Sequence, residues 1–122
     1  PAGSGIMTVS VLDRDVVEEL QSVMGSDFRT LVESFFRDSE QRLTLLQEVI
    51  ERGDAEELRQ TAHSFKGSSG NLGALALSGL CLELEQAGRA GQLDQAPELL
   101  ERIRQAYDEA RRELEQYIET DA

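Results

Sequence analysis

Apolar residues recur at steps of three and four along most of this chain, which is the spacing of one buried face of an α-helix. Glycine, aspartate and serine interrupt the pattern at intervals, and no alternating apolar run is long enough to predict a sheet. The pattern predicts helices over about 13–24, 27–52, 54–73, 75–90 and from about 94 through 117. Asp54 is expected to cap the third helix.

Each predicted helix carries one apolar stripe. The stripes are Val16, Val17, Leu20, Val23 and Met24; Phe28, Leu31, Val32, Phe35, Ser39, Leu43, Leu46 and Ile50; Leu58, Ala62, Phe65, Ser69 and Leu72; Leu77, Leu80, Cys81, Leu84 and Ala87; and Leu100, Ile103, Tyr107, Ala110, Leu114 and Tyr117. Short connections favour antiparallel neighbours, so the predicted fold class is all-α, an antiparallel up-down four-helix bundle with an additional short N-terminal helix across one end. We interpret residues 1–10 as an expression remnant or flexible start and residues 11–122 as one domain.

The charge balance narrows the set of partners. The chain has 24 acidic and 12 basic residues, and a net charge of −12 repels nucleic acid and anionic membrane surfaces. No apolar run is long enough to span a bilayer and no signal peptide is evident, so we expect a cytoplasmic protein. The single cysteine, Cys81, cannot form an internal disulfide and is expected to be a buried, inert thiol. We expect a monomer with no metal site and no cofactor.

The segment TAHSFKGSSGNLGA, residues 61–74, departs from ordinary bundle composition. Gly67 and Gly70 each cost a helix roughly 1 kcal/mol relative to alanine, which indicates that they serve another purpose. At roughly 100° per residue, His63 points away from Phe65, and Lys66 and Gly67 lie beside it on the exposed face. A missing side chain at Gly67 would let another protein approach the imidazole closely.

These neighbours suit phosphoryl chemistry. A neutral imidazole is a good nucleophile toward phosphorus, and Lys66 can neutralise the oxygens of a phosphoryl group in transfer. The run AHSFKGSSGNLGALALSGLCLELE, residues 62–85, resembles the signature of the histidine-containing phosphotransfer (HPt) domain family. The signature is a histidine, then lysine and glycine one turn later, small residues, Leu-Gly-Ala, and a following helix with Cys and Leu-Glu.

The resemblance implies that His63 accepts a phosphoryl group on its outward ring nitrogen from an aspartyl phosphate and passes it to another receiver domain. The implied partners are receiver domains of response regulators or of hybrid sensor histidine kinases. Any Mg²⁺ would belong to the receiver's acidic pocket, and this chain would have no kinase activity of its own. Lys66 would assist the phosphoryl oxygens, and apolar residues of the N-terminal helix would form part of the docking patch.

Family members often carry a glutamine on the following helix that bonds the inner ring nitrogen of the histidine, and this sequence has Glu85 at the expected position. A carboxylate can also orient the ring, although the neighbouring Gln86 is an alternative. The remaining binding residues that we expect around His63 are Gly67, Gly70, Ser69, Gln60 and Arg59.

The main alternative is a pseudo-HPt adaptor that binds a receiver or kinase without carrying phosphate. A receiver phosphatase is a weaker option, because a positioned base is needed and only Glu85 offers itself. A nucleotide-binding loop at GSSGNLG is excluded, because the segment lacks the Lys-Ser/Thr ending and the preceding strand. A plain helical scaffold leaves the glycines around the only histidine unexplained.

Overall fold

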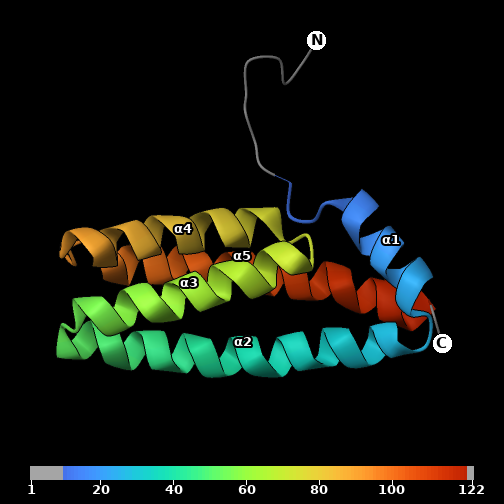
Figure 1. Cartoon of the computed structure of the whole chain (residues 1–122), viewed down its shortest axis with the longest axis horizontal. Helices are drawn as coiled ribbons and strands as arrows, with labels where there is room; N and C mark the ends of the chain where they lie inside the picture. The colour runs from blue at the N-terminus through green and yellow to red at the C-terminus, as the bar shows by residue number, and fades with distance from the viewer. Residues whose placement is uncertain (1–9, 121–122) are drawn as a thin grey trace, which may run out of the picture.

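The computed structural model of the chain describes residues 10–120, and within this range it contains five α-helices and no strand. They are α1 (Arg14–Met24), α2 (Asp27–Arg52), α3 (Ala55–Asn71), α4 (Leu75–Ala90) and α5 (Ala96–Thr120). Helices α2 to α5 lie side by side and alternate in direction, and α1 lies across one end of the bundle (Figure 1). In the bundle, α3 packs between α2 and α4, and α5 closes the ring between α4 and α2. The predicted fold class is confirmed. Residues 1–9 of the predicted flexible start lie outside the described residues.

Short-range chemistry explains where the helices begin and end. The Asp13 side chain accepts from the backbone N–H groups of Asp15 and Val16 at the start of α1, and Asp54 accepts from Glu57 at 3.0 Å, as its predicted cap requires. Helix α2 ends at Gly53 in the left-handed conformation, with φ of 71°. The last helix begins two residues later than expected, because a turn closed by the bond from Ala96 N–H to Leu93 O precedes it.

The core follows the predicted stripes most closely in α3. All five predicted residues of that helix segment are buried, with Phe65 and Leu58 fully excluded from solvent. The prediction is wrong for Val23 of α1, which is 78% exposed. Helix α1 lies across the bundle end (Figure 1), and Val17 is the residue of its predicted stripe that is fully buried.

Close packing of α3 against α4 fixes the height of one helix relative to the other. A Cβ atom at Gly88 would lie 2.9 Å from both the carbonyl oxygen of Ala55 and the backbone nitrogen of Arg59. Further along the same pair, the Ser78 hydroxyl donates to the carbonyl oxygen of Lys66 at 3.2 Å. The two helices therefore meet in a single register, which determines the α4 side chains that face the middle of α3.

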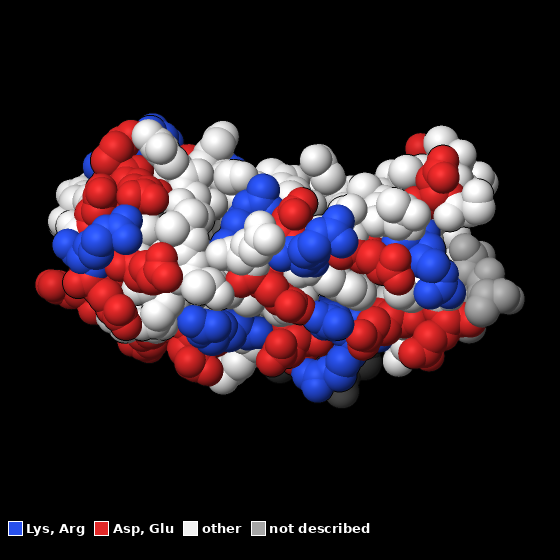
Figure 2. Space-filling view, turned by 90° about the horizontal axis from the view of Figure 1, so that it is seen from below, with Lys and Arg blue, Asp and Glu red and all other residues white. Residues whose placement is uncertain are grey.

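The surface of the bundle mixes both signs of charge. Seen from below, on the side of α2, acidic and basic side chains are interspersed with uncharged ones (Figure 2). No uniform basic field covers the part of this face that the structure describes. Within residues 10–120, no helix has the combination of length and apolarity that crossing a bilayer requires.

Candidate functional site

His63 lies in the middle of α3 on the outer side of the bundle. Its side chain is 63% exposed, and its Nδ1 atom lies 3.0 Å from Oε2 of Glu85 on α4. No side chain among the described residues bonds the other ring nitrogen, Nε2. The ring is therefore held at its inner nitrogen and open at its outer one.

Glu85 is the buried centre of this cluster. Its side chain is only 4% exposed, and it receives three cationic or potentially cationic groups: Lys66 Nζ on Oε1 at 2.8 Å, and both His63 Nδ1 and Arg89 Nη2 on Oε2 at 3.0 Å. The hydrogen bond from Lys66 lowers the pKa of Glu85 to about 2, with His63 assisting, although burial acts in the opposite direction. Glu85 is accordingly a carboxylate at neutral pH.

The ionised carboxylate also determines which tautomer the ring adopts. A carboxylate only accepts hydrogen bonds, so the short contact requires a proton on Nδ1 of His63. In the neutral ring, the lone pair then lies on Nε2, which faces solvent. The structure brings Glu85, and not the exposed Gln86, against the imidazole.

Arg89 is a member of the cluster that the sequence reasoning missed. It lies four residues after Glu85 on α4, the spacing at which opposite charges on a helix meet. That spacing was the available signal. The Arg89 side chain is 65% exposed and that of Lys66 is 28% exposed, so both cations reach the solvent-facing edge of the site while sharing one buried carboxylate.

The surface around His63 is open where the glycines lie. Gly67 is exposed, and a Cβ atom added there would meet nothing within 4 Å. Gly70 is also exposed, with only the Ser78 hydroxyl 3.5 Å from the position of an added Cβ. Ser69 corrects the expected binding set: its side chain is fully buried in the core, because position 69 follows Phe65 by one helical turn.

The two other expected binding residues lie one turn before His63. Arg59 donates to Glu56 through Nε and Nη2 at 3.1 and 2.6 Å, and Gln60 donates to the same carboxylate at 3.0 Å. Arg59 is partly buried and Gln60 is exposed. Both are thus tied to Glu56 on their own helix, and Gln60 remains accessible at the surface.

A second cation approaches α3 from the opposite side. Arg42 of α2 donates from Nη2 to the hydroxyl of Ser64 at 3.0 Å and from Nη1 to that of Ser68 at 3.5 Å. Spacing within one helix could not predict this contact, because Arg42 and Ser64 lie on different helices, 22 positions apart. His63 therefore has Glu85 with its two cations on the α4 side and Arg42 on the α2 side.

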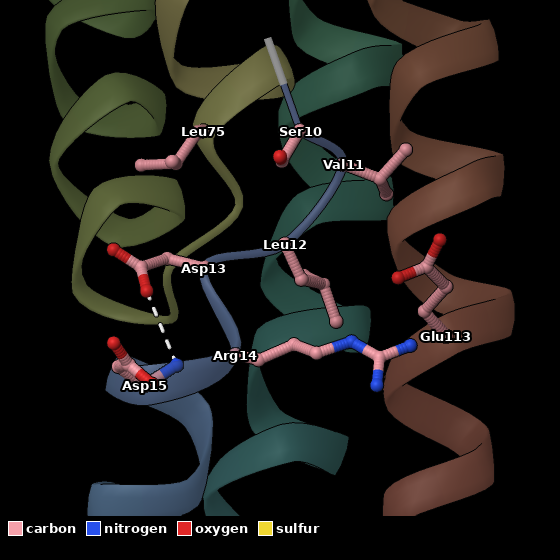
Figure 3. A pocket seen from close by; sticks show the side chains of 8 residues that line it. All are labelled: Ser10, Val11, Leu12, Asp13, Arg14, Asp15, Leu75 and Glu113. Carbon is pink, nitrogen blue, oxygen red and sulfur yellow. Dashed lines mark hydrogen bonds between the residues drawn. The ribbon is translucent and has the colours of Figure 1, made fainter.

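A hollow lies where the segment before α1 meets α4 and α5. Figure 3 shows its lining, in which the Arg14 side chain extends toward α5 and Asp13 bonds the backbone of Asp15. Leu75 contributes from the start of α4. This lining contains no histidine or cysteine.

Residues 10–120 contain neither a reactive thiol nor a cluster of metal ligands. Cys81 is buried, and burial raises the pKa of its thiol to about 12. No group of three or more His, Cys, Asp and Glu side chains in the described range is arranged to hold a metal ion. The arrangement that remains is an outward imidazole, oriented by a buried carboxylate and flanked by cations.

A four-helix bundle that presents one oriented, exposed histidine defines a class of helical domains built to offer an imidazole to another protein. The family model described as Hpt domain matches residues 30–113, and the chain belongs to this family. Family membership, which the sequence predicted, is thereby confirmed.

Individual relatives agree with this assignment. The chain is 42% identical to histidine-containing phosphotransfer protein B (HptB) from Pseudomonas aeruginosa PAO1, with a TM-score of 0.86 over 90% of this chain and 96% of that one. It is 28% identical over 106 residues to histidine-containing phosphotransfer protein 4 of Arabidopsis thaliana, covering 84% of each. Ypd1 of Saccharomyces cerevisiae, solved with the receiver domain of the response regulator Ssk1, shares the fold, with a TM-score of 0.86 at 19% identity over 94% of this chain and 99% of that one.

Proposed function

We propose that this chain is a phosphocarrier in which His63 receives a phosphoryl group from an aspartyl phosphate of one receiver domain and donates it to an aspartate of another. The observation that carries the proposal is the contact of His63 Nδ1 with the ionised Glu85, which leaves Nε2 exposed with its lone pair outward. Family membership and the complex of Ypd1 with a receiver domain support receiver domains as the partners.

The transfer follows from this geometry. The Nε2 lone pair of His63 attacks phosphorus, the P–O bond to the partner's aspartate breaks, and the electron pair leaves with the aspartate carboxylate. The proton on Nδ1 stays in its hydrogen bond to Glu85, which stabilises the positive charge that the ring acquires. In the second half, an incoming aspartate attacks phosphorus and the N–P electron pair returns to Nε2.

Lys66 and Arg89 supply positive charge at the edge of the reacting group. Both are anchored to Glu85 and both remain partly exposed, and we propose that they stabilise the oxygens of a phosphoryl group carried by Nε2. Gly67 provides the open surface on which the partner sits. We propose that residues 11–122 act as one monomeric, cytoplasmic unit without kinase activity, and that any Mg²⁺ is held by the receiver.

The test is phosphotransfer from a labelled receiver domain. Incubation with a ³²P-labelled aspartyl phosphate receiver should give an acid-labile, base-stable adduct on this chain, and His63→Gln should abolish it while the helical circular dichroism is retained. Labelling that persists in His63→Gln would rule out His63 as the carrier. Receiver binding by the wild-type chain without any labelling would instead identify a pseudo-HPt adaptor.

A further inference from the structure

Arg42 is held in a fixed position beside His63 by two hydroxyl groups from another helix. It extends from α2 to Ser64 and Ser68 of α3, and Ser64 is the residue next to His63. The Ser68 hydroxyl donates its own hydrogen to the carbonyl oxygen of Phe65 at 3.3 Å, which turns a lone pair toward Arg42. The guanidinium therefore bonds to two neighbouring turns of α3 in the free protein.

Among the described residues, Arg42 has no carboxylate partner at ion-pair distance, although Asp38, one turn earlier on α2, lines the same hollow. Within residues 10–120, its bonding partners are the two hydroxyls, and no carboxylate forms an ion pair with it. On the opposite side of His63, by contrast, Lys66 and Arg89 share Glu85. Two of the five guanidinium N–H donors are occupied by the hydroxyls, so an edge remains for a bidentate carboxylate contact.

We infer that Arg42, positioned by Ser64 and Ser68, binds a surface carboxylate of the receiver domain that docks on His63, and that this contact selects and orients the partner. The inference rests on the proposed function. A docked protein covers about 800 Å² of its partner, a patch roughly 30 Å across, so a footprint centred on His63 includes the Arg42 guanidinium. The transferred phosphoryl group is excluded as the ligand, because Ser64 lies about 100° around α3 from His63, on the side away from Lys66.

Charge complementarity favours a carboxylate as the ligand. This chain carries a net charge of −12, so an acidic partner surface is repelled except where it meets a cation without an ion-pair partner. Arg42 offers a partner carboxylate a positive charge that two hydrogen bonds already hold against α3, so less side-chain entropy is lost on binding.

The experiment compares Arg42→Gln with a matched control, Arg37→Gln. Arg37 lies on the same helix and also bonds a serine hydroxyl, that of Ser34 at 3.1 Å, but five positions earlier it faces about 140° away around α2. For the cognate receiver, Arg42→Gln should raise Kd about tenfold, and Arg42→Glu should raise it further. The affinity of Arg42→Gln should also fall less steeply with added NaCl than that of the wild type. Arg37→Gln should stay within about twofold of the wild type.

Labelling by a small phosphodonor separates failure of this inference from failure of the proposed function. Phosphoramidate needs no docking surface, so Arg42→Gln should be labelled on His63 at the wild-type rate while its transfer from the receiver slows. Unchanged receiver affinity and salt dependence in Arg42→Gln, with normal wild-type transfer, would overturn the inference alone. Absence of wild-type labelling by both donors would overturn the proposed function. Ser64→Ala combined with Ser68→Ala, which keeps the charge but removes its anchors, should weaken receiver binding by a smaller factor than Arg42→Gln.

Discussion

Replacing Gly67 with glutamine should make this protein more stable and less active at the same time. Gly67 lies in the interior of α3, is exposed, and has nothing within 4 Å of an added Cβ atom. Glutamine is a good helix former, so it should stabilise the folded state by roughly 0.5 to 1 kcal/mol relative to glycine. The unfolding entropy is about 2.1 cal/mol/K per residue, so over 122 residues a gain of about 1 kcal/mol raises Tm by about 4 °C.

The same side chain should obstruct the partner. A glutamine one turn from His63 extends several ångströms into the space where a receiver docks, and a displacement of about 1 Å at a reacting centre costs about 10²-fold in rate. We therefore expect transfer from a phosphorylated receiver to slow by about 10²-fold, while labelling by phosphoramidate is unchanged. Stopped-time gel assays give the rates, and thermal circular dichroism gives Tm.

Gly79 is the matched control. It is an exposed glycine in the interior of α4, also with nothing within 4 Å of an added Cβ, so Gly79→Gln should raise Tm by a similar amount. Its transfer rate should stay within about threefold of the wild type, since it does not flank His63. The reasoning is refuted if Gly67→Gln transfers at the wild-type rate, or if it lowers Tm, because either result means that the open backbone at Gly67 serves packing rather than access.

Three further predictions concern the interior. Gly88→Ala places a methyl group 2.9 Å from backbone atoms of Ala55 and Arg59, so it should lower the free energy of unfolding, measured in urea, by about 1 to 3 kcal/mol. An unchanged urea midpoint would contradict the close approach of α3 and α4. The pKa of Glu85 is lowered to about 2 from an ordinary 4.5, so the stability that its ion pairs contribute is complete above about pH 4.5 and is lost as the pH falls through about 2. The difference in urea midpoint between the wild type and Glu85→Gln should therefore shrink over that pH interval. A constant difference would show that the ion pairs of Glu85 do not cause it. Cys81, whose pKa burial raises to about 12, should react with a thiol reagent only after unfolding, and rapid labelling of the native protein would contradict its burial.

The sequence predicts the helices well because their signals are local. The cap at Asp54 and the glycine after α2 act within one turn, so no knowledge of the rest of the fold is needed to place them. The exposure of Val23, by contrast, depends on parts of the fold far from it in the sequence. An amphipathic stripe shows which face of a helix is apolar, but how much of that stripe is covered depends on where the neighbouring helices end, and α1 crosses only the end of the bundle.

The site residues also divide into those that local spacing predicts and those that depend on helix packing. His63, Lys66 and Gly67 are predicted together because helical spacing alone places them on one face. Glu85 and Gln86 are neighbours on α4 and differ by about 100° in direction, so the choice between them depends on how α4 is rotated against α3. Close packing at Gly88 fixes that rotation of α4, and the local sequence does not predict the rotation.

The charges around His63 suit a carrier that must accept a phosphoryl group and then release it. Lys66 and Arg89 contribute two positive charges and Glu85 one negative charge, so the cluster carries a net charge of +1 while the imidazole is neutral. A phosphoryl group brings about two negative charges, and a stronger positive field would stabilise the phosphorylated state at the expense of the next transfer. A glutamine at position 85 would leave the two cations unopposed. The buried carboxylate bonds the inner ring nitrogen, and on the proposed function we expect it also to limit how tightly the flanking cations hold the group that the ring carries.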